Sequence, residues 1–174
     1  MLSLNLAKIR TPEGHFERVY KPDELRAESD VYSIVAPVSL TFDIFKDKDR
    51  FRLAGRVATT LEVSCSRCLD PFTVAVDAPF DLRYQPLAPN AVEVEREIGS
   101  DDLDTAYYEN DEIDLEQLMQ EQFILALPMK PLCKDDCRGL CATCGTNLNK
   151  ATCDCSPQWE DPRLAGLKAL KKES

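Results

Sequence analysis

The sequence contains one histidine and six glycines among its 174 residues, and it has no long run of apolar side chains. The single histidine, His15, stands in a polar stretch, which nearly removes histidine-dependent catalysis. No apolar run approaches the ~18 residues that cross a bilayer. The start of the chain does not have the basic and then apolar pattern of a signal peptide. We therefore expect a cytoplasmic protein without a membrane partner.

Neither a glycine-rich phosphate loop nor a histidine-based triad is present, and these motifs are common foundations of enzyme sites. We expect a protein that is not an enzyme and has no small-molecule substrate. The eight cysteines fall short of the ~8–10% content that marks secreted disulfide scaffolds. Because disulfides are rare in a reducing cytosol, the thiols indicate metal or redox chemistry.

The net charge of −10 comes from one segment. Residues 93–121 hold twelve acidic residues against one base, Arg96, which gives −11, whereas the rest of the chain has 20 basic and 19 acidic residues. Such a segment repels RNA phosphates and attracts basic proteins. The alternative interpretation is a solvated loop whose charges keep the protein soluble.

Three stretches alternate apolar and polar side chains, at residues 38–44, 51–63 and 72–84. This period of two predicts strands with one buried face, and the short connections favour an antiparallel meander. Apolar side chains at helical spacing predict a helix over residues 115–127, which Pro128 ends. Asp114 and Gln117 precede and begin this helix as in a capping box.

The predicted fold class is α+β. We expect an antiparallel β meander, curled into a sandwich or a partial barrel and covered by a helix, followed by a Cys-rich zinc-binding module and a short closing helix. The expected parts are an N-terminal extension at 1–30, a β core with its helix at 31–130, an acidic loop at 85–112 within that core, and the zinc module with the closing helix at 131–174.

The cysteine spacing predicts structural zinc, because such a site takes four thiolates in a tetrahedron and a Cys-x-x-Cys turn supplies two of them. One expected site consists of Cys141, Cys144, Cys153 and Cys155. The remaining thiols make a second site of Cys65, Cys68, Cys133 and Cys137. Two sites are favoured. The alternative is a single site of Cys133, Cys137, Cys141 and Cys144, with the other thiols free.

Two other kinds of thiol chemistry fit less well. A redox pair sits at the start of a helix, whereas Pro71 and a strand pattern follow the Cys65 and Cys68 pair. A catalytic zinc ion keeps one ligand position open for water, whereas these thiols can fill every position.

Clustered bases on the first hairpin make candidate RNA-binding residues of Arg50, Arg52, Arg56 and Arg67, although interspersed acids also suit a solvated strand face.

The chain contains four blocks in the order CSRCLDPF, DEIDLEQLMQEQFILALPMKPLC, CRGLCATCGTNLN and DPRLAGLKAL. Together, over about residues 30–172, they resemble the bacterial YceD family of large ribosomal RNA subunit accumulation proteins. The resemblance implies a non-enzymatic role in the synthesis, processing or stability of 23S ribosomal RNA. It includes the cysteine pairs and transfers no catalytic residue.

The acidic segment suggests how such a factor works. We expect the partner to be a basic large-subunit ribosomal protein or a pre-ribosomal particle, with ribosomal RNA contacted directly or indirectly. The expected partner-binding residues are Asp101, Asp102, Asp104, Glu109, Asp111 and Glu112. The alternatives are a zinc protein that binds ribosomal RNA directly and a protein that handles thiols or metals.

Overall fold

The structure is a computed structural model that describes residues 2–25, 31–87 and 105–155. Over these residues it contains a six-stranded sheet, a two-stranded sheet and one α-helix. The elements in chain order are β1 (Ser3–Asn5), η1 (Leu6–Lys8), β2 (Glu13–Tyr20), η2 (Pro22–Glu24), β3 (Ser33–Ile34), β4 (Val38–Asp47), β5 (Arg50–Ser64), β6 (Pro71–Pro86), β7 (Thr105–Tyr108), β8 (Glu112–Asp114) and α1 (Leu115–Ala126).

The three long strands β4, β5 and β6 form the expected antiparallel meander. Successive side chains of a strand face opposite sides of a sheet, so the apolar residues of the alternating pattern share one face. Leu40, Leu53, Val57 and Leu61 on this face are completely buried. Gly55 on β5 lies too close to β4 for a side chain, because a Cβ atom there would overlap the backbone oxygen of Thr41.

The edges of the sheet differ from a simple meander. The strand order is β2-β4-β5-β6-β7, and β3 pairs with β5 outside that path. The pair of β6 and β7 is parallel, so the sheet is mixed rather than wholly antiparallel. Residues expected to form an N-terminal extension supply β1 and β2, and β2 pairs with β4 along its whole length. The sequence signal of β2 is weak because most of its side chains are exposed.

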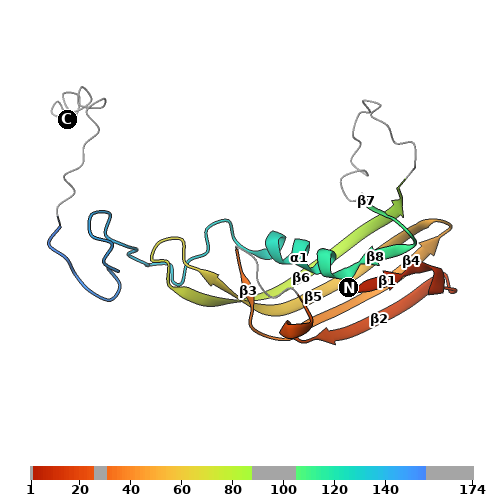
Figure 1. Cartoon of the computed structure of the whole chain (residues 1–174), viewed down its shortest axis with the longest axis horizontal. Helices are drawn as coiled ribbons and strands as arrows, with labels where there is room; N and C mark the ends of the chain where they lie inside the picture. Colours follow the sequence, from red (N-terminus) through yellow and green to blue (C-terminus); the bar gives the residue numbers. More distant parts are fainter. Residues whose placement is uncertain (1, 26–30, 88–104, 156–174) are drawn as a thin grey trace, which may run out of the picture.

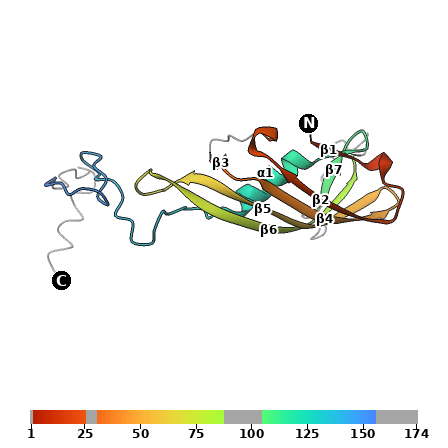
Figure 2. The same cartoon turned by 90° about the horizontal axis from the view of Figure 1, so that it is seen from below.

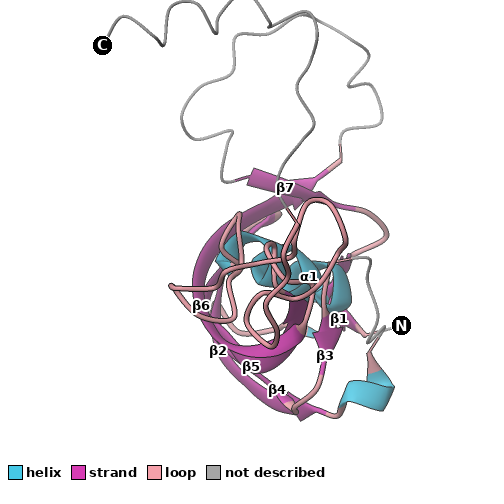
Figure 3. Ribbon diagram, turned by 90° about the vertical axis from the view of Figure 1, so that its left-hand side faces the viewer, coloured by secondary structure: helices cyan, strands magenta, loops and turns pink. Residues whose placement is uncertain are grey.

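The six-stranded sheet is curled, in the manner of the expected partial barrel (Figure 3). Figure 3 shows α1 lying inside the curve of this sheet. Leu118, Met119 and Phe123 of α1 are buried against it, and the ring of Phe123 meets Tyr32 edge-on with 5.8 Å between centroids. The helix therefore fills the concave side and contributes four of the buried residues of the main core, Leu115, Leu118, Met119 and Phe123.

Asp114 caps α1 as expected, because its carboxylate accepts hydrogen bonds from the backbone amides of Glu116 and Gln117 at 2.9 and 3.1 Å. The reciprocal bond of a capping box is not made. The Gln117 side chain instead donates to Glu121 at 2.9 Å. The last helical residue is Ala126, two residues before Pro128, which agrees with the predicted end.

The β5–β6 hairpin is longer than the helix that covers it, and its tip extends to the cysteine-rich segment (Figure 1). Figure 2 shows the same reach from below, with the cysteine-rich segment following at the tip of the hairpin. Within the expected acidic loop 85–112, the structure describes the end of β6 and the strands β7 and β8. The expected closing helix and the acids Asp101, Asp102 and Asp104 lie outside the described residues.

Candidate metal centre

The tip of the β5–β6 hairpin folds into a tight cysteine turn. The amide of Cys65 donates to the carbonyl of Asp70 at 3.0 Å, and the amide of Leu69 donates back to the carbonyl of Cys65 at 2.9 Å. Leu69 adopts φ 61°, a left-handed conformation that is unfavourable for a residue with a side chain. The turn places the sulfurs of Cys65 and Cys68 on the same side of the hairpin tip.

A second turn repeats this geometry in the C-terminal segment. The amide of Cys141 donates to the carbonyl of Thr146 at 2.8 Å, and the amide of Gly145 donates to the carbonyl of Cys141 at 2.9 Å. Gly145 has φ 74° and occupies the position that Leu69 occupies in the first turn. Two stretches of unlike sequence thus form the same turn, here called a knuckle, each with two cysteines.

Each knuckle is completed by two further cysteines. The structure gathers Cys65, Cys68, Cys133 and Cys137 into one group, here called cluster 1, whose sulfurs all lie within 4.8 Å of one another. Cysteines Cys141, Cys144, Cys153 and Cys155 form cluster 2 under the same limit. These are the two groups predicted from the spacing. The alternative set of Cys133, Cys137, Cys141 and Cys144 does not form a group among the described residues.

The sulfur separations in cluster 1 fit a tetrahedral ion. Four sulfurs at ~2.3 Å from one zinc ion lie about 3.8 Å from each other. The sulfurs of Cys65 and Cys137 are 3.7 Å apart, and those of Cys68 and Cys133 are also 3.7 Å apart. Cys65, Cys68 and Cys137 are buried, whereas Cys133 is exposed. Cluster 1 therefore has the ligand number, ligand type and spacing of a closed structural site.

Side chains and backbone around cluster 1 join the hairpin tip to the C-terminal segment. The Arg67 guanidinium donates to the carbonyl of Cys137 at 2.9 Å, and the amide of Leu140 donates to the carbonyl of Arg67 at 3.1 Å. The Asn149 side chain donates to the sulfur of Cys137 at 3.3 Å. Hydrogen bonds to a ligand sulfur orient it and tune a bound metal. Gly139 is required beside this contact, because its φ of 75° favours glycine and a Cβ there would lie 3.0 Å from the Arg67 carbonyl.

Hydrogen bonds and an ion pair connect the two knuckles. Asp70, directly after the first knuckle, pairs with Lys150 at 2.9 Å and accepts a hydrogen bond from Asn147 at 2.9 Å. The hydrogen bond from Lys150 holds the pKa of the Asp70 carboxyl below its ordinary value. Asp70 therefore stays charged near neutral pH and contributes to holding the two cysteine clusters in a fixed relation.

Hydrogen bonds and neighbouring thiols separate the pKa values within each cluster. The backbone amide of Cys133, followed by those of nearby residues, lowers the pKa of Cys65 to about 6. Loss of solvent and the surrounding thiols raise the pKa of Cys133 to about 12. In cluster 2 the Thr146 hydroxyl leads the groups that lower the pKa of Cys144 to about 6, while a hydrogen bond with Cys144 leads those that raise the pKa of Cys155 to about 12. Each cluster thus offers a ready thiolate and holds protons that a metal ion must displace.

The four candidate RNA-binding arginines do not gather at one place. Arg50 and Arg52 lie near the far end of the hairpin, whereas Arg67 lies at the tip and contacts cluster 1. Arg52 forms a two-point ion pair with Asp81, at 2.7 and 2.5 Å. Arg56 pairs with Asp77 at 3.4 Å. Within this set, Arg67 has a structural contact that the sequence did not indicate.

The described acids of the expected partner-binding set lie at one turn between β7 and β8. Glu109, Asp111 and Glu112 are all exposed, and the amide of Glu112 donates to the carbonyl of Glu109 at 3.0 Å. Asn110 and Asp111 both have positive φ, the backbone of a primed hairpin turn. The turn therefore presents three carboxylates to solvent from a defined backbone.

Sequence reasoning missed the polar residues that support cluster 1. Asn149, Asn147 and Lys150 lie in the TNLNK stretch after the second knuckle, and each contacts the hairpin or a cluster 1 sulfur. Their only sequence signal is their position between two cysteine pairs.

None of the described helices is long and apolar enough to cross a membrane.

Comparisons with known proteins point to one family. The sequence model of the large ribosomal RNA subunit accumulation protein YceD matches residues 53–171. The chloroplastic protein of Arabidopsis thaliana named large ribosomal RNA subunit accumulation protein YCED homolog 1 is 27% identical, over 86% of this chain and 54% of that protein. The protein of the same name from Zea mays is 28% identical, over 78% of this chain and 53% of its own.

An uncharacterized protein of Mycobacterium leprae is 30% identical over 65% of this chain and 50% of its own. The chain therefore spans about half the length of these curated relatives. No solved structure matches it.

Proposed function

Because this chain belongs to the large ribosomal RNA subunit accumulation protein YceD family, we propose that it is a non-enzymatic factor for biogenesis of the large ribosomal subunit. In this proposal it supports the synthesis, processing or stability of 23S ribosomal RNA. The observation that carries the proposal is the extent of the family match, residues 53–171, which includes the whole β5–β6 hairpin tip and both cysteine clusters.

We further propose that clusters 1 and 2 each bind one structural zinc ion. All-sulfur ligand sets favour zinc over magnesium or calcium, and the 3.7 Å sulfur separations fit its tetrahedron. The chemistry that zinc would supply here is cross-linking. Cluster 1 would join the β5–β6 hairpin to the segment that follows α1, while cluster 2 would close the second knuckle on its own.

The exposed carboxylates of Glu109, Asp111 and Glu112 support one partner class, a basic ribosomal protein of the large subunit. They belong to the segment of residues 93–121 that carries the net negative charge of the chain. A concentrated charge of one sign steers and holds a partner of the opposite sign. A thiol- or metal-handling role is less well supported, because four sulfurs around one position leave no open site for exchange.

The partner proposal is tested by a tagged pull-down from native lysate, with and without ribonuclease. The variant Glu109→Gln, Asp111→Asn, Glu112→Gln removes three charges and keeps the shapes of the side chains. We expect a basic large-subunit protein to remain bound after ribonuclease treatment and to be weakened at least fivefold by the variant. Loss of all partners with the RNA would exclude the acidic turn as the holding surface.

The function itself is tested by deleting the gene and measuring the ratio of large- to small-subunit ribosomal RNA. We expect the ratio to fall and the wild-type gene to restore it. Cys65→Ser is expected to restore it poorly, whereas Arg18→Gln, an exposed change on β2 far from the clusters, restores it fully. An unchanged ratio in the deletion strain overturns the proposal. We propose the cytoplasm as the location, although the names of the two plant relatives place those proteins in the chloroplast.

A further inference from the structure

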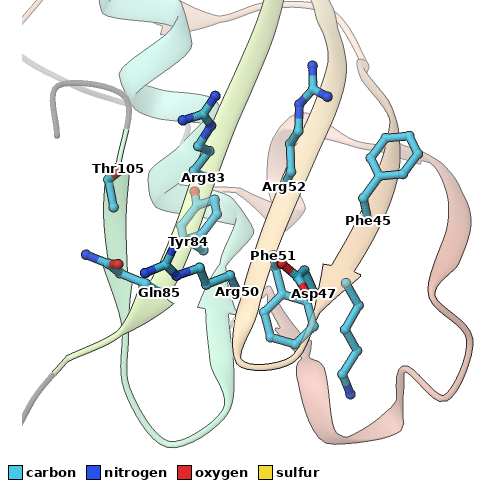
Figure 4. A pocket seen from close by; sticks show the side chains of 10 residues that line it. Phe45, Asp47, Arg50, Phe51, Arg52, Arg83, Tyr84, Gln85 and Thr105 are labelled. Atoms are coloured by element: carbon cyan, nitrogen blue, oxygen red, sulfur yellow. The ribbon is translucent and has the colours of Figure 1, made fainter. Parts of the chain in front are cut away.

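A hollow of about 520 Å³ lies at the end of the β4–β5–β6 meander away from the cysteine clusters. Four basic side chains and one acid line it: Lys46, Arg50, Arg52, Arg83 and Asp47. Figure 4 shows Arg52 on β5 and Arg83 on β6 projecting side by side in the same direction, with Phe45 beside them on β4. The volume falls within the ~300–1,000 Å³ of typical ligand sites.

The strand register creates this arrangement. Phe45 lies opposite Arg52 on the neighbouring strand, and Arg52 lies opposite Arg83. One row across the three strands therefore carries an aromatic ring and then two guanidinium groups. All three side chains are exposed, with Phe45 38% accessible. Arg50 pairs with Asp47 in the next row that faces the same way. The row therefore places an exposed aromatic ring beside several cations.

This row is costly for folding alone. Like charges directly opposite on neighbouring strands destabilise a sheet, and Arg52 and Arg83 are such a pair. The two-point ion pair with Asp81 offsets the charge of Arg52. With Asp81 counted, the hollow has an excess of two positive charges, four bases against Asp47 and Asp81. The Arg52 guanidinium also lies over the Phe45 ring, 5.9 Å from its centroid, which extends the flat surface.

We propose that this hollow binds a short single-stranded segment of RNA, with phosphates on Arg50 and Arg83 and a base stacked on the Phe45 and Arg52 surface. Aromatic side chains and guanidinium planes are the usual stacking partners of unpaired bases, and clustered cations neutralise the phosphates. This inference rests on the proposed function, in which the RNA belongs to the large subunit. It differs from the arginine set predicted from the sequence by including Phe45 and Arg83 and leaving out Arg56 and Arg67.

The test measures binding of the purified full-length protein to labelled oligouridylate and oligoadenylate of about 12 nucleotides, a length within known single-strand site sizes. Fluorescence anisotropy is recorded between about 50 and 200 mM salt, where phosphate contacts weaken strongly. We expect both RNAs to bind, Arg83→Glu to weaken binding at least tenfold and lower the salt slope by about 1, and Phe45→Ala to weaken binding about tenfold.

Arg56→Glu is the matched control for Arg83→Glu, because Arg56 is an exposed arginine on the neighbouring strand β5, is paired with Asp77 and lies outside the hollow. We expect it to change affinity less than twofold. Thermal melting confirms that each variant is folded. Equal losses for Arg56→Glu and Arg83→Glu, or no binding by the wild type at low salt, overturn the proposal.

Two further experiments separate this proposal from binding of an acidic protein and from the proposed function of the whole chain. An acidic peptide that competes as well as RNA at equal charge would reassign the hollow to an acidic protein. The Arg83→Glu variant is then placed in the deletion strain. If it restores large-subunit ribosomal RNA fully although its RNA binding is lost, the hollow has no part in the function, while the proposed function stands. If the deletion has no effect on ribosomal RNA, the proposed function fails whatever the hollow binds in solution.

Discussion

Leu69 holds a backbone conformation that its side chain disfavours, at the position where the other knuckle has Gly145. The left-handed conformation costs a residue with a Cβ atom ~1–2 kcal/mol, and glycine loses about 0.5–1 kcal/mol more than other residues on ordering. Because Leu69 is 64% exposed, little packing is lost on its removal. We therefore expect Leu69→Gly to raise the free energy of unfolding of the zinc-bound protein by about 0.5 kcal/mol.

Ser66→Gly is the control for Leu69→Gly, since Ser66 lies in the same turn without a positive φ. There glycine gains nothing in the folded state and adds freedom to the unfolded chain, so the change is expected to destabilise by about 0.5–1 kcal/mol. Urea denaturation of the two variants measures both effects. Equal destabilisation by the two changes would show that the left-handed turn at Leu69 carries no strain.

Acid is expected to release metal from both clusters. The pKa of Cys65 and that of Cys144 are lowered to about 6, so each thiolate is available above that pH and its contribution is lost as the pH falls through it. Bound metal competes with protons and moves release to lower pH. We expect metal retention at pH 7 and release with a midpoint below pH 6, measured by a chromogenic chelator. Retention that does not change down to pH 4 would contradict thiolate ligation.

At the scale of elements, the start of α1 offers a sharp comparison. Asp114 accepts two amide hydrogen bonds, whereas the Gln117 side chain turns toward Glu121 and makes no bond to the cap. Asp114→Ala is expected to cost about 1 kcal/mol of stability, or a fall of ~2–4 °C in melting temperature for a chain of this size. Gln117→Ala is expected to cost much less. Similar losses in the two variants would restore the capping box that the sequence suggested.

The long strands and α1 were predictable because each buries one face. The apolar residues of such an element therefore recur at a regular spacing in the sequence. The alternation in β4, β5 and β6 identifies the buried residues Leu40, Leu53 and Val57 without a structure. The edge strand β2 lacked such a signal, since most of its side chains are in water, and β7 is only four residues long, too short for a period to show. The parallel pairing of β6 and β7 depends on a long connection, and no pattern in the local sequence predicts this pairing.

The cysteine grouping was predictable for a different reason. Eight thiols and a four-ligand rule allow few arrangements, and the two knuckles fix two pairs at once. The supporting contacts were not predictable. Asp70, Asn147 and Lys150 meet across the two knuckles, and Asn149 reaches Cys137. These contacts depend on the path of the chain between Pro128 and Cys153, where few apolar side chains set a pattern.

At the scale of the whole molecule, the cysteine clusters and the curled sheet have separate cores. Cys65, Cys68 and Cys137 form a small buried group beside Leu132, and Phe72 is the one partly buried side chain that packs against both this group and the main core under α1 in the described residues. We expect chelation to free the C-terminal segment and leave the sheet folded. Trypsin should then cut rapidly at Lys134 and Arg138, while the melting transition of the sheet persists. Loss of the whole transition on chelation would show that metal and sheet fold as one unit.

Charge is also arranged at this scale. The basic hollow and the acidic turn lie at the β6 and β7 end of the sheet. Thr105 lines the hollow, and Glu109, four residues later, belongs to the acidic turn. The cysteine clusters lie at the opposite end of the β5–β6 hairpin (Figure 1). The β5–β6 hairpin thus connects the cysteine clusters at its tip to two surfaces of opposite charge, which suits the proposed factor that holds protein and RNA together.

The most direct measurement for the central claim is the metal content of the purified protein by native mass spectrometry, for the wild type, Cys65→Ser and Cys141→Ser. Two independent tetrathiolate sites predict two zinc ions in the wild type and one in each variant, with cluster 2 retained in Cys65→Ser and cluster 1 retained in Cys141→Ser. A wild type with one ion, or a Cys65→Ser variant with the same count as the wild type, would contradict the pairing of the hairpin cysteines with Cys133 and Cys137.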